Sequence, residues 1–526
     1  MTTTAEPEAA QSAGAAAPMT HREVLEALSG LLLAMFVAML SGTIVANALP
    51  RIIADLDGNQ EQYTWVVTAT LLAATATTPI WGKLADRMSK KLLVQLSITI
   101  FVIGSILAGF SQSTETLIGW RVLQGLGMGG LQALVQIVMA SMVAPRERGR
   151  YMGYFGAVMA VATVGGPLLG GFIVDTEALG WRWCFWVGAP IAIVALILLQ
   201  KTLHLPVMKS DAKIDWWGAL LIPAGISVLL IWVTLAGKNF AWLSWSSAAF
   251  LAGGLVLIAA AVFAERRVAD PVVPPRLMRQ RTMILAVIAS VSVGIAMFGS
   301  TVFFGQYFQV SRGYSPTASG LLTLPMIAGL LVASTVSGQL VTRTGRWKRF
   351  LVAGTAMIVA GLALLGTIDH ATSLVLVGAY MTVLGVGLGM SMQNLVLAVQ
   401  NGLHYSDLGA GTSTVTFFRS LGGAAGVSVL GAILATHVSD LIAKGLAAIP
   451  GAGAATQSGG STSLDLSTLP DPVRVIVEHA YGDGTALAFM IAAAVAVVAF
   501  VSVLFMRETS LRTSVQDDAE VESVTV

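Results

Sequence analysis

Long apolar segments, separated by short clusters of charged residues, recur along almost the whole chain. Of its 526 residues, 55% are hydrophobic and only 11% are charged, whereas soluble proteins carry roughly a quarter charged residues. A bilayer core about 30 Å thick is crossed by about 20 apolar residues in a helix. The pattern therefore predicts an all-α polytopic membrane protein embedded in a lipid bilayer, and it excludes a series of soluble domains.

Fourteen apolar runs are long enough to be membrane helices. Gly and Pro interrupt many of them, which a bundle in lipid tolerates because neighbouring helices satisfy the freed backbone groups. The predicted spans are residues 27–48, 64–84, 92–110, 117–142, 151–173, 184–203, 215–236, 247–264, 283–305, 317–340, 350–367, 373–400, 410–436 and 485–506.

The placement of lysine and arginine predicts the orientation of these spans. With the N-terminus inside the cell, 22 of the 30 basic residues fall in cytoplasmic segments, six fall outside, and Arg121 and Arg419 lie within spans. We therefore expect a multi-pass protein of the cell membrane with both termini in the cytoplasm. We expect a disordered tail over residues 1–26 and an acidic, solvated tail over residues 507–526. An outer loop is expected over residues 437–484.

Composition also excludes several function classes. The net charge is only +2 and no basic stripe occurs outside the predicted spans, so no nucleic-acid partner is expected. All six histidines lie in loops or at span ends, and the single cysteine, Cys184, is interpreted as a small buried hydrophobe, so neither a metal site nor a cofactor is predicted. With no nucleophile cluster and no nucleotide-binding loop, the chain is not expected to be an enzyme.

Two loops carry the same short pattern. The loop that begins at Gly82 and the one that begins at Gly338 share glycine, leucine and arginine at their first, third and sixth positions. A duplicated six-helix unit explains this repeat. Residues 27–203 and 283–506 are then expected to be two halves, and residues 204–282 an inserted pair of helices.

Several motifs together resemble a known family. The loop Gly82-Lys-Leu-Ala-Asp-Arg-Met-Ser-Lys-Lys91 resembles the loop motif of the major facilitator superfamily, with Ser89 in place of a glycine. Residues 121–129 resemble another pattern of this family, and residues 153–171 resemble the motif associated with its antiporters. Further segments resemble the fourteen-helix drug:proton antiporter subfamily of EmrB and QacA type, namely residues 43–50, 181–185, 214–216, 315–320 and 418–423.

The resemblance implies a major facilitator fold of two six-helix halves plus two inserted helices. It also implies a secondary active multidrug efflux transporter that exports amphiphilic small molecules by alternating access, driven by the proton gradient. The alternatives are an exporter of one endogenous metabolite, lipid or self-made antibiotic, and a receptor or scaffold without transport. The sequence does not indicate whether an accessory protein takes part.

Gating residues are expected at inner helix ends and along residues 151–173. Asp86 can sit at a helix N-terminus or pair with a cation, forming a latch that breaks as the halves rock. The family resemblance adds Arg87 and the arginines of the next inner loop, although positive-inside topology alone would also explain them. The glycines allow close helix approach, and Pro167 removes one backbone bond. The predicted set is Gly82, Asp86, Arg87, Arg146, Arg148, Gly153, Gly166, Pro167, Gly170 and Gly171.

Coupling and substrate residues are expected inside the spans. An intramembrane arginine normally faces a cavity or a partner, which nominates Arg121 with its helix neighbour Gln124, and also Arg419, whose alternative role is a packing clamp. Resemblance and residue type add wall candidates, for which plain packing is the alternative. These wall candidates are Met35, Phe304, Tyr307, Gln309, Gln393 and Asn394.

The sequence lacks a carboxylate in the middle of any predicted span. The subfamily usually has Asp in the first span where this chain has Ser41. The hypothesis is that the pocket favours neutral or anionic amphiphiles over cations. Proton coupling then depends on peripheral carboxylates such as Asp86, Asp175 or Asp407, or transport uses another gradient.

Overall fold

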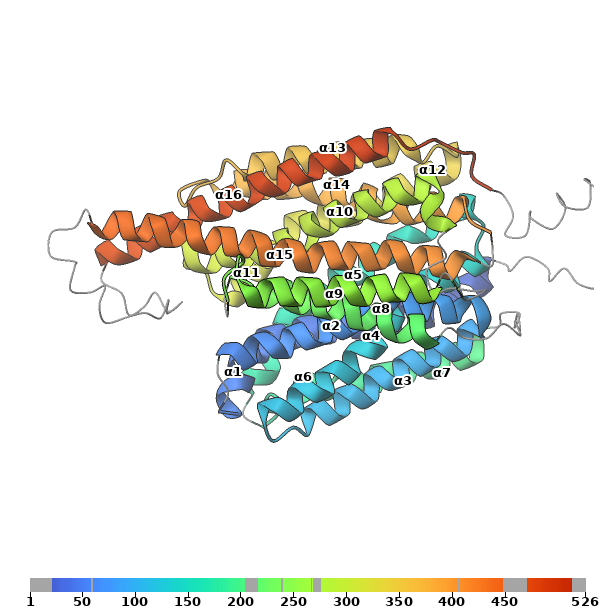
Figure 1. Ribbon diagram of the computed structural model, residues 1–526, viewed down its shortest axis with the longest axis horizontal. Helices are drawn as coiled ribbons and strands as arrows, with labels where there is room; N and C mark the ends of the chain where they lie inside the picture. The colour runs from blue at the N-terminus through green and yellow to red at the C-terminus, as the bar shows by residue number, and fades with distance from the viewer. Residues whose placement is uncertain are drawn as a thin grey trace, which may run out of the picture.

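Every named element in the described part of the chain is a helix, as the computed structural model shows (Figure 1). The structure describes residues 21–57, 60–176, 178–203, 216–237, 240–265, 267, 276–404, 407–447 and 471–512. Most of the expected N-terminal tail, residues 1–20, lies outside these ranges, as do residues 513–526.

The N-terminal half contains α1 (His21–Asp55), α2 (Gln60–Arg87), α3 (Lys90–Gly109), α4 (Thr114–Met142), α5 (Pro145–Asp175), α6 (Trp183–Trp186) and α7 (Gly188–Thr202). The inserted pair is α8 (Trp216–Leu235) and α9 (Trp245–Glu265). The C-terminal half contains η1 (Leu277–Arg279), α10 (Arg281–Gln306), the π-helical turn η2 (Tyr307–Ser311), α11 (Pro316–Leu322), α12 (Leu324–Thr344), α13 (Lys348–Leu365), α14 (Leu374–Asn401), α15 (Leu408–Ala447) and α16 (Asp471–Leu504).

The prediction of an all-α membrane protein is confirmed. Twelve helical segments among the described residues are long and apolar enough to cross a membrane. The helices α2 and α8 occupy the other two predicted positions without being among these twelve, so the count of fourteen is supported only in outline. Large apolar side chains also cover the outside of the bundle, as at Phe172, 65% exposed, and Val256, 66% exposed, a surface that suits lipid better than water.

The two halves pair their helices in the same way. In the N-terminal half α4 packs on α2 and α3, and α1 packs on α5 and α7. In the C-terminal half α14 packs on α12 and α13, and α10 packs on α15 and α16. Glycines make the close contacts at equivalent places: Gly125 meets the backbone of α2, and Gly385 meets that of α12. The repeat seen in the sequence is therefore also a repeat of packing.

The inserted hairpin lies beside the seam between the halves. Figure 1 shows α8 and α9 between the N-terminal half and α15. Ile226 of α8 joins a small apolar cluster with Leu72 and Ala76 of α2 and Phe417 of α15. The hairpin thus covers one of the two lines along which the halves meet.

The expected outer loop and C-terminal tail need correction. The helix α15 continues to Ala447 and α16 begins at Asp471, so residues 437–447 and 471–484 of the predicted loop are helical. Apolar packing explains the extension of the two helices. Val438 is buried, and Gly445 lies so close to Ile476 of α16 that a side chain at position 445 would collide with it. Residues 507–512, called the C-terminal strap below, likewise pack on the bundle at the end where α2 ends and α15 begins. We call this end the latch end.

The two repeated loops differ in backbone conformation. Gly345 ends α12 with φ of 70°, which favours glycine. The equivalent Ser89 has φ of −55°, and its hydroxyl accepts a hydrogen bond from the Leu92 N–H as the N-cap of α3. Serine at this place therefore begins a helix without backbone strain.

Candidate functional site

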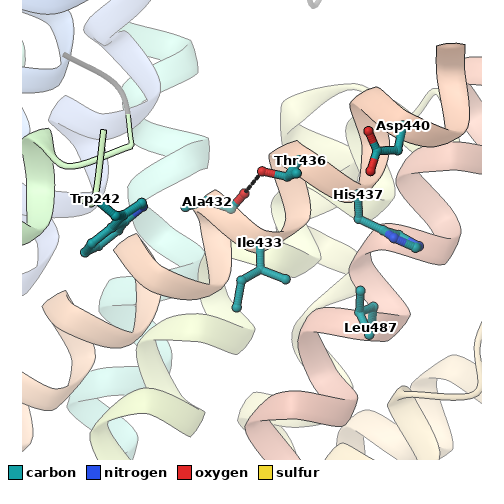
Figure 2. Close-up of a pocket in the computed structure, with 7 residues that line it drawn as sticks. All are labelled: Trp242, Ala432, Ile433, Thr436, His437, Asp440 and Leu487. Carbon is teal, nitrogen blue, oxygen red and sulfur yellow. Dashed lines mark hydrogen bonds between the residues drawn. The ribbon is translucent and has the colours of Figure 1, made fainter. Parts of the chain in front are cut away.

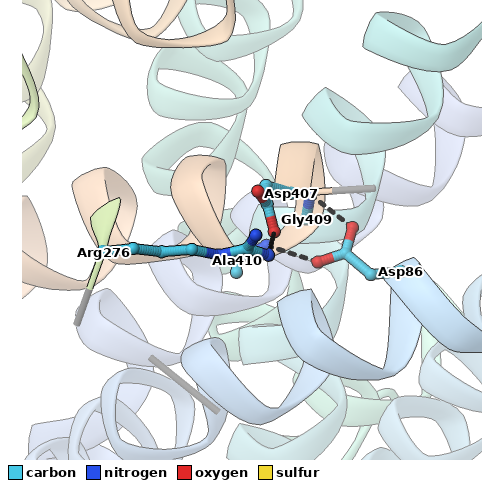
Figure 3. A network of polar contacts seen from close by, with 5 residues as sticks. All are labelled: Asp86, Arg276, Asp407, Gly409 and Ala410. Carbon is cyan, nitrogen blue, oxygen red and sulfur yellow. Dashed lines mark hydrogen bonds and ion pairs between the residues drawn. The ribbon is translucent and has the colours of Figure 1, made fainter. Parts of the chain in front are cut away.

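The latch end joins α2 to α15 through one carboxylate. Asp86, in the last turn of α2, accepts hydrogen bonds from the backbone N–H groups of Gly409, at 2.7 Å, and Ala410, at 2.9 Å (Figure 3). These groups begin α15, where the first N–H groups have no partner within the helix and the dipole favours negative charge. The structure thus places Asp86 at a helix N-terminus, across the seam between the halves.

Gly82 lies one turn before Asp86 on the same face. A Cβ atom at Gly82 would collide with the side chain of Ser413 and the carbonyl oxygen of Gly409. The absence of a side chain therefore lets α2 approach α15 closely enough for the carboxylate to reach the backbone.

Charged neighbours surround this contact. Asp407, 7% exposed, forms an ion pair of 2.8 Å with Arg276, whose side chain is 68% exposed (Figure 3). Lys83 and Arg87 are buried in the same turns of α2. The pairing of Arg276 with the turn before α15 is a contact that the sequence did not reveal.

Burial raises the pKa of Asp86 to about 7, although the two backbone N–H groups and the nearby Lys83 and Lys90 act in the opposite direction. Desolvation disfavours the charged carboxylate, and here it outweighs the groups that stabilise the charge. The pKa of Asp86 therefore lies near neutral pH while the carboxyl is buried in this contact.

A second polar contact joins the halves along the other seam, between α5 and α14. Arg148 is 2% exposed. Its guanidinium donates to Gln400 Oε1 at 2.7 Å and to two backbone carbonyls, those of Ala140 and Val143, at 2.7 and 2.8 Å. Burial and the charge of Arg512 lower the pKa of Arg148 to about 9, which leaves it charged at neutral pH.

The two predicted loop arginines therefore have different places. Gln400 extends the Arg148 contact to α15, because its amide donates to Thr412 Oγ1 at 3.0 Å. Arg146 is exposed, and its backbone N–H donates to the Arg512 carbonyl of the C-terminal strap at 3.3 Å.

The predicted glycines of α5 face two different helices. Gly153 meets Thr335 of α12, in the other half, whereas Gly166 and Gly170 meet Thr43 and Ile44 of α1, in the same half. A Cβ at Gly171 would touch no other atom within 4 Å. The side chain of Pro167 lies outside the described residues.

Arg121 stands in a neutral network near the start of α4, about 10 Å from its first residue. It is 5% exposed and donates to the Val66 carbonyl at 3.2 Å and to Gln124 Oε1 at 2.5 Å. The Gln124 amide in turn donates to Ser105 Oγ at 2.5 Å and to Ser41 Oγ at 3.2 Å. The serine that replaces the subfamily's aspartate is therefore part of this network.

The wall candidates do not form one surface. Phe304 and Tyr307 are fully buried in the core of the C-terminal half, where Phe304 packs on Phe489 of α16 and the Tyr307 hydroxyl donates to the Asp369 carbonyl. A π-helical turn begins at Tyr307, directly after α10, and no sequence signal reveals it.

The other wall candidates lie elsewhere in the bundle. Met35 is buried in the N-terminal core, and Gln309 is exposed. Asn394 donates to the Met390 carbonyl on its own helix, and Gln393 is half-buried. Plain packing therefore describes Met35 as well as Phe304 and Tyr307.

A groove of about 380 Å³ lies far from the latch end (Figure 2). Its walls come from α15, α16 and the turn before α9. The lining residues are Trp242, Ala432, Ile433, Thr436, His437, Asp440 and Leu487. Ala432 follows Gly409 by 23 residues of α15, so the groove begins about 35 Å along this helix from the Asp86 contact.

Comparison with known proteins agrees with this geometry. The sequence profile of the Major Facilitator Superfamily matches residues 31–427. An uncharacterized MFS-type transporter of Mycobacterium tuberculosis is 36% identical over 98% of this chain and 74% of its own length. The multidrug transporter protein MdtP of Bacillus subtilis is 34% identical over 79% of this chain and 76% of its own length. The solved structure of the proton:xylose symporter XylE shares the fold, with a TM-score of 0.64 at 13% identity over 95% of this chain and 99% of that chain.

The bundle is that of a membrane transporter built from two similar halves, and not of an enzyme. The chain belongs to the Major Facilitator Superfamily, which confirms the resemblance of its motifs. Two relatives are named as a multidrug transporter and an efflux pump, and this chain is a multi-pass membrane protein of the same family.

Proposed function

We propose that the chain is a secondary active multidrug efflux transporter, which exports amphiphilic small molecules by alternating access and is driven by the proton gradient. One observation carries the proposal. At the latch end, polar contacts join the described parts of the two halves: Asp86 with the first N–H groups of α15, and Arg148 with Gln400. Such contacts break without disrupting either apolar core, as alternating access requires.

Asp86 is the proposed site of proton coupling. With the latch end closed, its pKa is about 7 because of burial. Opening returns the carboxyl to water, where an aspartate has a pKa of about 4, so the proton is released. Uptake and release of one proton are in this way tied to closing and opening of the latch end.

The test uses purified protein in liposomes with an imposed pH gradient and a neutral fluorescent amphiphile. We expect transport to follow the gradient in the wild type and to lose that dependence in Asp86→Asn. The matched control is Asp55→Asn, at the end of α1, where the carboxylate pairs with Arg51 on the surface. Equal transport with and without the gradient in the wild type would exclude proton coupling.

The orientation of the chain is also a proposal. The 22 basic residues on the predicted inner side support an orientation in the cell membrane with the latch end and both termini facing the cytoplasm. Reporter fusions after Arg512 and at residue 455 test this. An enzyme reporter that works only in the cytoplasm is expected to be active at the first position and inactive at the second, and the reverse result would invert the topology.

A further inference from the structure

Four arginines are buried among the described residues: Arg87, described above at the end of α2, and Arg121, Arg148 and Arg419, whose side chains differ in what they contact. The guanidinium of Arg148 reaches three acceptors, and that of Arg121 reaches two. Arg419 of α15 is as well buried, with 8% exposed, yet its guanidinium has no hydrogen-bond acceptor or ion-pair partner among the described residues. The role of a packing clamp to backbone carbonyls, which the sequence left open, therefore does not describe it.

The backbone of Arg419 is fixed firmly in place. Its carbonyl oxygen packs directly against Gly294 of α10, where a Cβ atom would collide with it. The following glycines extend this contact, because Gly422 meets Val291 and Gly423 meets the ring of Phe298. Arg419 is the twelfth residue of α15, so it lies about 16 Å inside the bundle from the latch end.

An unpaired cation at this depth is costly. Removing a guanidinium from water is strongly unfavourable unless an anion, several acceptors or remaining water compensate. The two carboxylates at the start of α15 are already used there, since Asp86 of α2 binds the helix N-terminus and Asp407 of the preceding turn binds Arg276. The compensation must therefore come from outside the chain, either from water or from a bound anion.

We infer that Arg419 binds the anionic head of a transported amphiphile, so that the substrates of this efflux transporter include amphiphilic carboxylates and other oxyanions. This inference rests on the proposed function and names a substrate class for it. A guanidinium offers paired N–H donors that match a planar carboxylate. Two half-buried rings near Arg419 in space or sequence, Phe298 and Phe418, supply apolar surface for the rest of such a molecule.

The neutral network around Arg121 agrees with this substrate class. A site for lipophilic cations needs an accessible carboxylate. Here Ser41 lies where the subfamily has aspartate, and the other groups in the network around Arg121 are only an amide, hydroxyls and a backbone carbonyl. Arg121 and Arg419 thus both favour anions over cations inside the bundle.

The test compares two probes that differ only in charge: dansylated undecanoic acid and its primary amide. Binding is measured by fluorescence on the purified full chain in detergent. We expect the wild type to bind the acid about tenfold or more tightly than the amide, as for hydrogen bonds to a charged group. Arg419→Gln is expected to bind both probes equally, and Arg419→Lys to retain part of the preference. The matched control, Arg281→Gln, alters an exposed arginine at the start of α10 and is expected to behave as the wild type.

Further arms separate the possible outcomes. The acid is expected to raise the Tm of the wild type but not that of Arg419→Gln, which also shows whether the variant folds. If Arg419→Gln keeps the preference for the acid, or if chloride or inorganic phosphate binds at Arg419 and the acid does not displace it, the inference is overturned. Gradient-driven transport of a neutral amphiphile, measured in parallel, shows whether the proposed function stands independently of that result.

Discussion

Asp86 is held between two opposing effects. Two backbone N–H groups and nearby lysines stabilise its charge, while burial disfavours the charge more strongly and raises its pKa to about 7. The raised pKa belongs to the closed latch end, because opening exposes the carboxyl to water. By linkage, the state with the higher pKa binds the proton more tightly and is favoured by acid.

The first prediction follows from this sign. Closure of the latch end is expected to be most favourable below about pH 4, the pKa of Asp86 in the open state. Between about pH 4 and pH 7 the closed-to-open ratio is expected to fall by up to tenfold per pH unit. The measurement is the distance between spin labels at Met88→Cys and Arg346→Cys, both exposed residues near the latch end. Cys184 is buried and does not take up the label.

Asp86→Asn provides the comparison for the pH series. Its amide cannot ionise in this range, although its oxygen can still accept one of the two backbone hydrogen bonds. The closed fraction of this variant is therefore expected to be independent of pH. If the variant follows the same pH profile as the wild type, another group carries the effect, and the assignment to Asp86 is wrong.

Gly82 gives the second prediction. In Gly82→Val the new side chain would enter the space of Ser413 and the Gly409 carbonyl, so the latch end is expected to stay open and transport to fall at least about tenfold. The collision lies on the seam and not within a core, so the Tm should change little. The matched control is Gly42→Val, where a Cβ atom would meet no other atom within 4 Å. Normal transport by Gly82→Val would show that this close approach is dispensable.

Residue motifs predicted the latch better than the interior. The spacing of Gly82 and Asp86 in the repeated loop marked both residues, and both lie at the contact with α15. The partner of Arg148 had no such signal, because Gln400 is separated from it by 252 positions and belongs to no motif. Phe304 shows a different limit, since residue type does not tell a cavity wall from a packed core.

At the scale of elements, the C-terminal strap connects three loops of the latch end. The Trp347 ring N–H donates to the Thr509 carbonyl at 3.0 Å, and Asn401 exchanges hydrogen bonds with residues 509, 510 and 512. The Arg512 carbonyl accepts from Arg146 of the other half. A segment that composition predicts to be solvated thus links both halves, because its polar backbone meets unsatisfied groups at helix ends.

The third prediction concerns this strap. Truncation after Met506 removes these hydrogen bonds, each worth about 1 kcal/mol, and is expected to lower the Tm and to shift the latch end towards the open state. Truncation after Arg512 keeps all of them and serves as the control. Fluorescence-detected thermal unfolding in detergent measures the difference, and equal Tm values for the two truncations would mean that the strap contributes nothing to stability.

The order of the long helices was predictable from apolar periodicity, whereas the ends of the helices were not. The helix α15 exceeds its predicted span by eleven residues at the far end, because Val438 and Gly445 pack against α16. Such packing depends on a segment more than twenty positions away. Hydropathy along a single stretch of sequence cannot contain that information.

At the scale of the whole molecule, both seams of the latch end converge on the first turns of α15. Asp86 binds Gly409 and Ala410 directly, and Arg148 reaches Thr412 through Gln400. If each half moves as a rigid body, the two contacts form and break together. If the seams open separately, loss of one contact leaves the other unchanged.

The fourth prediction distinguishes these two motions. Arg148→Gln removes a charged hydrogen bond worth about 1.5–3 kcal/mol. If the halves rock as rigid bodies, the closed-to-open ratio is expected to fall about tenfold or more, and the fall is also seen at the seam between α2 and α15. The spin labels at Met88→Cys and Arg346→Cys report this ratio, and Arg150→Gln, an exposed neighbour, is the control. A label distance that stays unchanged in Arg148→Gln would show that the halves do not move as single bodies. The two polar contacts would then be independent, because the convergence on α15 would transmit nothing between the seams.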